Sequence, residues 1–399
     1  MKIIKTVQSF GVVVLLMAGA ASVSMASQAA GQTSSRWIAD TSCSANAAAI
    51  ANAAISHVVN LEFAAAVGAA DSALLIDPEC GAAKLVRALV ANNNAEWGSK
   101  QKWIATARSG KLSKSEQAMA NAAEATPNVS AVAARTVAAG NTSPLFAYWA
   151  AYADQANTAD QLEQFATAHA NHPTIAAPAY NSLAYAYAQA TWGVKTVDMA
   201  KAKAYIDKLI KAYPGMNSYD SQAEIFAMTG DYASALAAQQ RAVDIAGDQA
   251  DYGQRGSVYN RKVNAEQLKS TIAEYVKMMQ ASPTNDKVNI TRMARTMVAC
   301  DSNMSPCYTM DPAGIIAQNA KVTWTSEVEA TDIVVTLNDD ATVAIATFMN
   351  TGTYMMNGTS TAYRTRASSV WTREADGSWK QLHGNFAPAG GAGIPKRNH

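Results

Sequence analysis

The sequence has almost no net charge, and it lacks the local motifs of the common catalytic sites. Its 399 residues include 32 basic and 31 acidic side chains, for a formal net charge of +1. A balance this close offers no basic field to attract nucleic acid. No glycine-rich phosphate loop, serine-nucleophile elbow or metal-spaced histidine cluster is present. We therefore expect no cofactor, no metal and no nucleic-acid partner, and the sequence indicates architecture better than chemistry.

Long hydrophobic runs are also missing, apart from one at the start of the chain. Lys2 and Lys5 precede an uncharged apolar run from Phe10 to Ala21, and the small residues Ser24 and Ala26 follow it. This order is typical of a secretory signal peptide, here covering residues 1–26 with cleavage after Ala26. The run is shorter than the roughly 20 residues of a spanning helix, which disfavours a membrane anchor. We expect a periplasmic or secreted mature protein without a membrane span.

Cysteine is scarce, with four residues in the chain. In an oxidising compartment an even number of cysteines suggests disulfides, and four allow three connectivities. The local pairing, Cys43–Cys80 with Cys300–Cys307, needs no contact between distant domains. A metal site would have to recruit His57 or His383, but the spacings match no zinc pattern. We expect the two local disulfides.

Alanine divides the chain into two parts. Residues 1–250 contain 66 alanines and residues 251–399 contain 18. In the first part apolar residues recur at three and four positions between Pro and Gly breaks, which predicts short amphipathic helices in antiparallel pairs. We expect an all-helical domain over residues 36–250, a polar joint at 247–253, an α+β domain over 258–388 and a disordered tail over 389–399.

Two helical pairs share a repeated pattern. In the clearer copy a helix around Ala223 is followed by a Gly230-Asp231-Tyr232 turn and a second helix with close contacts at Ala235 and Ala242. The other copy has an insertion around Trp192–Gly193 and carries the pattern at Leu183, Ala184, Tyr187, Ala202 and Pro214. These residues resemble the tetratricopeptide (TPR) repeat. The resemblance implies a stack of helical hairpins.

The TPR resemblance also implies a concave wall formed by the first helix of each pair. By the family pattern this wall would carry Asn181, Tyr185, Gln189, Asp220, Glu224 and Met228. Aligned polar side chains there could hold an extended peptide backbone, with Tyr185 and Met228 adding apolar contact. The alternative is that the six residues are ordinary surface or lie under flanking helices.

From Lys321 the hydrophobic period changes to two and β-branched residues dominate, which indicates strands. Expected strands are 321–328, 332–337, 342–349, 361–373 and 378–386, with turns at 338–340 and 376–377. Ala265–Met279 reads as an amphipathic helix before them, and residues 288–299 as a second one. The pattern predicts an antiparallel sheet with one face covered by helices.

The last strands resemble a known family. Val370-Trp371-Thr372-Arg373, the run from Asp376 to Lys380, and His383-Gly384-Asn385-Phe386 are similar to the closing hairpin of NTF2-like (cystatin-like) domains of the SnoaL and DUF4440 type. The resemblance covers about residues 320–388 and implies a cone-shaped pocket between sheet and helices. Asn385 and Ala387 depart from the polar residues of the family pattern.

Six residues are candidates to line that pocket: Trp324, Tyr354, Tyr363, Gln381, His383 and Asn385. Simple alternation along the last strand puts Gln381, His383 and Asn385 on one face. His383 could then serve as an acid, a base or a ligand-binding donor. The alternatives are a histidine on a polar sheet face and aromatic residues that belong to the core.

Two functional hypotheses follow. The first is an exported, non-enzymatic binding or scaffold protein, with a TPR-like groove for a protein or peptide and an NTF2-like domain that binds a small hydrophobic ligand or forms a homodimer. The second is a small-molecule isomerase, cyclase or hydrolase that uses His383 in the cone pocket. Fold alone does not decide between them. A deep polar pocket around His383 would favour the enzyme, whereas a His383 on the solvent side of the sheet would remove that argument.

Overall fold

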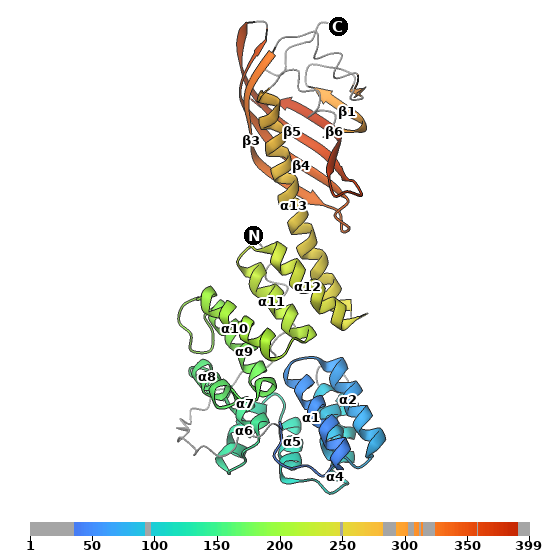
Figure 1. Cartoon of the computed structure of the whole chain (residues 1–399), viewed down its shortest axis with the longest axis vertical. Coiled ribbons are helices and arrows are strands. Elements are labelled where there is room, and N and C mark those ends of the chain that lie inside the picture. The colour runs from blue at the N-terminus through green and yellow to red at the C-terminus, as the bar shows by residue number, and fades with distance from the viewer. Residues whose placement is uncertain are drawn as a thin grey trace. The chain divides into compact units, whose positions relative to one another are not determined.

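A computed structural model describes residues 36–91, 97–247, 250–281, 293–301, 307–310, 313, 324–356 and 358–389 (Figure 1). The chain divides into two compact units, residues 1–252 and 253–399. We call them the helical unit and the sheet unit. The proposed signal peptide and the tail from residue 390 onward lie outside the described residues.

The helical unit contains short helices joined by tight connections. They are α1 (Ala45–Val59), α2 (Phe63–Ile76), α3 (Gly81–Ala91), α4 (Trp97–Arg108), α5 (Lys114–Glu124), α6 (Val129–Ala138), α7 (Pro144–Ala150), α8 (Thr158–Ala168), α9 (Pro173–Gln189), α10 (Met199–Ala212), α11 (Met216–Met228) and α12 (Tyr232–Ala246). Most neighbours in sequence pack against each other. The described residues of this unit are therefore helical, in the part of the chain that is rich in alanine.

The α11–α12 pair shows why these residues form a hairpin. Gly230 has φ of +79°, a left-handed conformation that glycine adopts without steric cost, so the chain can reverse there. The Asp231 side chain then accepts a 3.1 Å hydrogen bond from the Ser234 backbone N–H and caps α12. Ala235 and Ala242 are fully buried, as is Ala223 on the facing helix. The turn and the close contacts agree with the sequence prediction.

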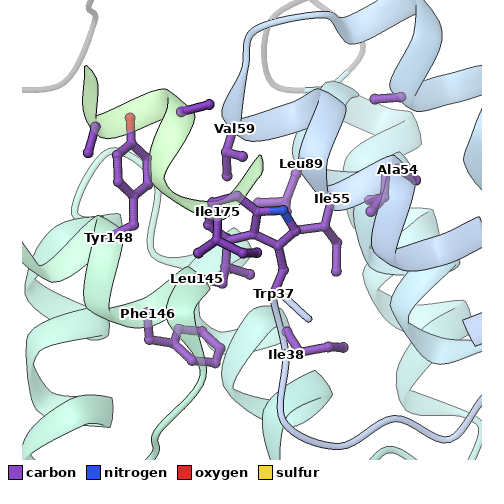
Figure 2. Close-up of a cluster of buried hydrophobic side chains, with 14 of the residues drawn as sticks. Trp37, Ile38, Ala54, Ile55, Val59, Leu89, Leu145, Phe146, Tyr148 and Ile175 are labelled. Atoms are coloured by element: carbon purple, nitrogen blue, oxygen red, sulfur yellow. The ribbon is translucent and has the colours of Figure 1, made fainter. Parts of the chain in front are cut away.

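Trp37 lies at the centre of the helical core, in the segment before α1 (Figure 2). Its indole lies among Ile55, Leu89, Leu145 and Ile175, which come from four different helices. Its backbone is also fixed, because its N–H donates to Asn52 Oδ1 at 2.7 Å and its carbonyl accepts from the Leu145 N–H at 3.0 Å. The segment before α1 is thus part of the core.

The sheet unit contains most of helix α13 (Ala250–Ala281) and a six-stranded sheet. The strands are β1 (Met293–Asp301), β2 (Tyr308–Met310), β3 (Trp324–Leu337), β4 (Val343–Met356), β5 (Thr359–Arg373) and β6 (Trp379–Pro388). Their order is β2-β1-β6-β5-β4-β3, and β3 to β6 form an antiparallel meander. β1 pairs parallel with β6.

Three expectations for the sheet unit are corrected. The expected strands 321–328 and 332–337 form one continuous strand, because a bulge around Asp332 absorbs the break in alternation. The expected helix 288–299 is strand β1 in its described part. The expected polar joint is helical from Ala250 onward, so α13 begins well before Ala265.

Helix α13 covers one face of the sheet. Leu268, Ile272 and Val276 of α13 pack on the covered face against Phe348, Tyr363, Ala367, Trp371 and Trp379. Exposure alternates along β5 from Tyr363 to Trp371, with the odd-numbered residues buried. The even-numbered residues therefore define the opposite face, which we call the outer sheet face.

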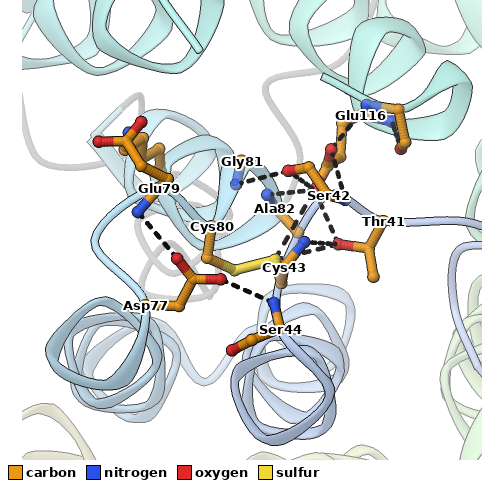
Figure 3. The surroundings of a disulfide bond; sticks show 12 residues. Thr41, Ser42, Cys43, Ser44, Asp77, Glu79, Cys80, Gly81, Ala82 and Glu116 are labelled. Carbon is orange, nitrogen blue, oxygen red and sulfur yellow. Dashed lines mark hydrogen bonds and ion pairs between the residues drawn. A yellow bond between two sulfur atoms is a disulfide. The ribbon is translucent and has the colours of Figure 1, made fainter. Parts of the chain in front are cut away.

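Both expected cysteine pairs are at disulfide distance. The S–S distance is 2.00 Å for Cys43–Cys80 and 2.04 Å for Cys300–Cys307. The first bond ties the segment before α1 to the turn between α2 and α3 (Figure 3). Among the described helices none is long and apolar enough to cross a membrane.

A fully buried carboxylate lies beside the first disulfide (Figure 3). Glu116 forms a capping box with Ser113 at the start of α5. It also accepts hydrogen bonds from Thr41 Oγ1 at 2.8 Å, from the Ser42 N–H at 3.0 Å and from the Ala82 N–H at 2.8 Å. One side chain therefore holds three separate segments together.

Candidate functional site

The six candidate wall residues on α9 and α11 have different surroundings. Tyr185 and Glu224 meet, because the Tyr185 hydroxyl donates to Glu224 Oε2. Burial raises the pKa of Tyr185 well above its ordinary value, and the Glu224 carboxylate raises it further. One helical turn further along each helix, Gln189 and Met228 are exposed. The structure thus brings four of the six positions to neighbouring turns of two adjacent helices.

Asp220 does not belong to an accessible wall. Its side chain is 4% exposed, and Gln239 Nε2 on α12 donates to Asp220 Oδ1 at 2.9 Å. The same Gln239 amide donates to the Tyr252 carbonyl at 3.1 Å. Asp220 therefore joins helices within the stack, which corrects its assignment as a peptide contact. Asn181 is half-buried, and its Oδ1 finds no partner among the described residues.

A hydroxyl cluster next to Tyr185 was missed from the sequence. The Tyr152 hydroxyl lies 2.5 Å from Ser182 Oγ on α9 and 3.1 Å from the Tyr148 hydroxyl on α7. The Trp192 ring approaches Tyr152 edge-on at 5.5 Å. The four-residue spacing of the two tyrosines indicates a shared helix face, but nothing in the sequence points to Ser182. Ser182 thus joins α9 to α7, just as Tyr185 joins α9 to α11. Polar side chains of α9 therefore contact both neighbouring helices.

A second missed network joins α8, α9 and α10. Glu163 Oε1 accepts from the hydroxyls of Tyr187 and Tyr205, both at 2.8 Å, and lies 2.9 Å from Lys201 Nζ. The two tyrosine rings stack with centroids 5.8 Å apart, and Lys201 lies 4.0 Å from the centre of the Tyr187 ring. Each of these polar groups has a partner within the network. We therefore interpret the network as a structural contact between the three helices.

The expectation that Gln381, His383 and Asn385 share one face is wrong. Strand β6 has a bulge at Leu382, where the register with β5 shifts: Gln381 pairs with Trp371, whereas His383 pairs with Val370. Residues directly opposite in adjacent strands point to the same side of the sheet. Gln381 therefore faces the covered side with Trp371. His383 and Asn385 lie on the outer sheet face with Val370 and Ser368.

The remaining pocket candidates are placed as follows. Tyr363 is 8% exposed and belongs to the core under α13. Gln381 is 4% exposed, and its Nε2 donates to the His383 carbonyl at 3.3 Å. The side chains of Trp324 and Tyr354 lie outside the described residues. Tyr363 and Gln381 thus share the covered face but lie at different ends of it, because Gln381 pairs with Trp371 rather than with a residue near Tyr363. His383 lies on the other face.

The outer sheet face has an apolar part that the sequence analysis did not single out. Val334 of β3, Val343 and Ile345 of β4 are 59%, 40% and 55% exposed. Ile345 pairs with Val370, and Val370 with His383, so one row of side chains crosses three strands. Exposed β-branched residues gathered on one sheet face are typical of a contact surface. The part of the chain that the structure describes contains no group of three potential metal ligands.

Comparison with solved structures finds domains that cover about a third of this chain. One is a putative Ca/calmodulin-dependent kinase II association domain from Exiguobacterium sibiricum, with 13% identity and a TM-score of 0.26 over 31% of this chain and 91% of that one. Another is an NTF2-like protein from Cytophaga hutchinsonii, with 14% identity and a TM-score of 0.25 over 30% and 98%. A third is an NTF2-like superfamily protein from Salmonella enterica serovar Typhimurium, with 13% identity and a TM-score of 0.26 over 33% and 95%. No protein-family model matches the chain, and no curated protein matches it in sequence.

Proposed function

We propose that this protein is an exported, non-enzymatic scaffold. Its TPR-like helical unit binds a protein or peptide, and its NTF2-like sheet unit joins two copies of the chain. The observation that carries the proposal is the outer sheet face: Val334, Val343 and Ile345 are exposed there, and His383 lies on that face. Catalysis in a covered pocket would need an acid or base on the other side of the sheet. The two disulfide-distance pairs fit an oxidising, extracytoplasmic compartment.

The sheet-unit proposal follows from the cost of exposing apolar surface. Each fully exposed valine or isoleucine that becomes buried contributes about 1.5–3 kcal/mol. Three such side chains on one face provide a driving force for association that isolated surface residues do not. These three are about half exposed, so they supply only part of the roughly 8 kcal/mol that a micromolar dimer needs, and the rest of the face must supply the remainder. We expect the mature protein to self-associate through this face.

Ile345→Glu is expected to abolish this dimer. A carboxylate buried between two apolar faces without a partner is strongly unfavourable, whereas on a free surface it costs little. Analytical ultracentrifugation of wild type and variant over 0.5–50 micromolar (a range chosen to bracket about 8 kcal/mol of binding) measures the result. Ile245→Glu is the matched control, because Ile245 is 48% exposed on α12. A wild type that stays monomeric, or an Ile345→Glu variant that dimerises equally well, would contradict self-association through this face.

The helical-unit proposal rests on the exposed residues beyond the Tyr185–Glu224 pair. Gln189 offers an amide that can donate and accept, and Met228 is a flexible apolar side chain that is 46% exposed. Such a pairing suits an extended peptide, whose backbone needs hydrogen bonds and whose side chains need apolar contact. The half-buried hydrogen bond between Tyr185 and Glu224 joins the two helices that carry these residues.

Replacing both Gln189 and Met228 with arginine is expected to remove partner binding without unfolding the helices. The measurement is capture from an envelope extract of the host by immobilised mature protein, with bound proteins quantified by mass spectrometry. Leu75→Arg is the control, because Leu75 is 86% exposed on α2. We expect at least a tenfold loss of the captured partner with the double variant and none with the control. Equal capture by all three proteins would exclude this surface.

A further inference from the structure

The outer sheet face carries opposite charges on different strands. Arg364 and Arg366 are exposed on β5, and Glu327 and Glu329 are exposed on β3. The register places Glu329 opposite Thr351 of β4, and Thr351 opposite Arg364. β4 separates the two charged strands, so they lie about 9–10 Å apart. Among the described residues no ion pair involves these four side chains.

The charged and apolar parts occupy different ends of the same face. Counted along β4, Val343 and Ile345 lie near the turn to β3, whereas Thr351 and Thr353 lie at the far end between the charged strands. Over β3, β4 and β5 the face therefore has an apolar end and a charged end, and the charged end is basic on one flank and acidic on the other. Two residues depart from this division: Lys380 of β6 lies beside the apolar end, opposite Thr372, and Met355, 47% exposed, lies at the charged end.

We propose that a second copy of the chain packs on the outer sheet face about a two-fold axis that runs along β4. The inference rests on the self-association proposed above and adds its orientation. Rotation about that axis leaves each residue at the same position along the strand direction. It exchanges the two sides of β4, so β3 of each copy lies over β5 of the other. Glu329 of one copy then meets Arg364 of the second copy, and the contact is made twice because the interface is isologous.

The competing orientation is less favourable. A two-fold axis across the strands would place the charged end of one copy over the apolar end of the other. Because this rotation keeps each strand over its own copy, Arg364 would lie over the end of β5 that carries Val370, and Glu329 over the end of β3 that carries Val334. Burying charges there without partners is costly. Only the axis along β4 places apolar on apolar and basic on acidic.

The dimensions of the face suit such a pairing. β4 has 14 residues, which at about 3.3 Å per residue span roughly 45 Å. Because β3 is the edge strand, an axis along β4 brings β3, β4 and β5 of the two copies over each other. Three strands at about 4.8 Å spacing then give a face on the order of 650 Å², somewhat below the roughly 800 Å² per partner of a standard interface. Packed sheets lie about 10 Å apart, a gap that arginine and glutamate can bridge together. Charge pairs at the rim of an interface set its register and its specificity.

Charge reversal tests the orientation directly. One variant carries Arg364→Glu and Arg366→Glu, and the other carries Glu327→Arg and Glu329→Arg. Each alone places like charges opposite each other, and we expect its dimer dissociation constant to rise at least tenfold. An equimolar mixture places opposite charges on facing flanks again, with residues 329 and 364 at the same height along the strands, so it should form a heterodimer about as tight as the wild-type dimer. Native mass spectrometry measures the three species, and circular dichroism confirms that both variants fold.

The outcomes separate the orientation from self-association itself. If wild type dimerises, Ile345→Glu prevents it, and neither charge variant changes the dissociation constant, the axis along β4 is wrong and the outer-face dimer stands. If both charge variants are monomeric and their mixture is monomeric too, the complementary pairing is also wrong. If wild type is monomeric, self-association fails and the orientation fails with it.

Discussion

Glu116→Ala is expected to destabilise the helical unit by about 3–5 kcal/mol. The carboxylate is fully buried and accepts hydrogen bonds from the segment before α1, from the start of α3 and from the start of α5. Alanine would leave the buried Ala82 N–H and the neighbouring donors without partners. Each unsatisfied buried donor costs about 1–3 kcal/mol.

Urea unfolding followed by far-ultraviolet circular dichroism measures this loss, since helices dominate that signal. Gln117→Ala is the matched control in the same helix, because Gln117 is exposed and its amide contacts Asn121 Oδ1 at 3.5 Å on the surface. A substitution at such a surface position changes stability by about 0.5 kcal/mol or less. If the two variants unfold at the same urea concentration, Glu116 is not the link between the three segments.

Trp379→Ala is expected to cost the sheet unit about 3–5 kcal/mol through the cavity that it leaves. The indole is 3% exposed and packs in the core under α13. Loss of so much buried surface removes both transfer free energy and close contacts. The sheet signal and the protection of β5 amides from hydrogen exchange should both fall.

Trp379→Phe is the control that separates volume from hydrogen bonding. The Trp379 Nε1 finds no hydrogen-bond partner among the described residues, so phenylalanine loses only part of the packing. Trp371 differs, because its Nε1 donates to Ser369 Oγ at 2.8 Å. Trp371→Phe should therefore cost more than Trp379→Phe. Equal losses for Trp379→Ala and Trp379→Phe would contradict a packing role.

Local patterns predicted the elements of the fold well. The Gly230-Asp231-Tyr232 turn, the buried Ala235 and Ala242, and the turns after β3 and β5 depend on neighbours in sequence, and the structure contains them. Ser113 and Glu116 have the spacing of a capping box, which would have indicated the start of α5. That pattern does not reveal that Glu116 also binds Ala82, because the contact joins residues 34 positions apart.

The candidate pocket failed for a specific reason. Alternation assigns side chains to a face only while the strand is regular, and one extra residue reverses the assignment of everything beyond it. The bulge at Leu382 does this between Gln381 and His383. Both bulges depend on pairing with a neighbouring strand, so a single-strand pattern cannot locate them. The hydroxyl cluster around Ser182 could not be predicted either, because Ser182 contacts tyrosines 30 and 34 positions away in the sequence.

The bulge in β3 has a consequence for solubility. β3 is the last strand of the sheet, so its outer backbone groups are open to pairing with another molecule, a route that has no natural end and leads to aggregates. Asp332 adopts φ of +54° within the bulge, which interrupts the straight edge, and Glu327 and Glu329 repel an approaching copy of the same strand. Growth of the sheet at this edge is disfavoured. Association through the face closes at two chains, whereas association through the edge would continue without limit.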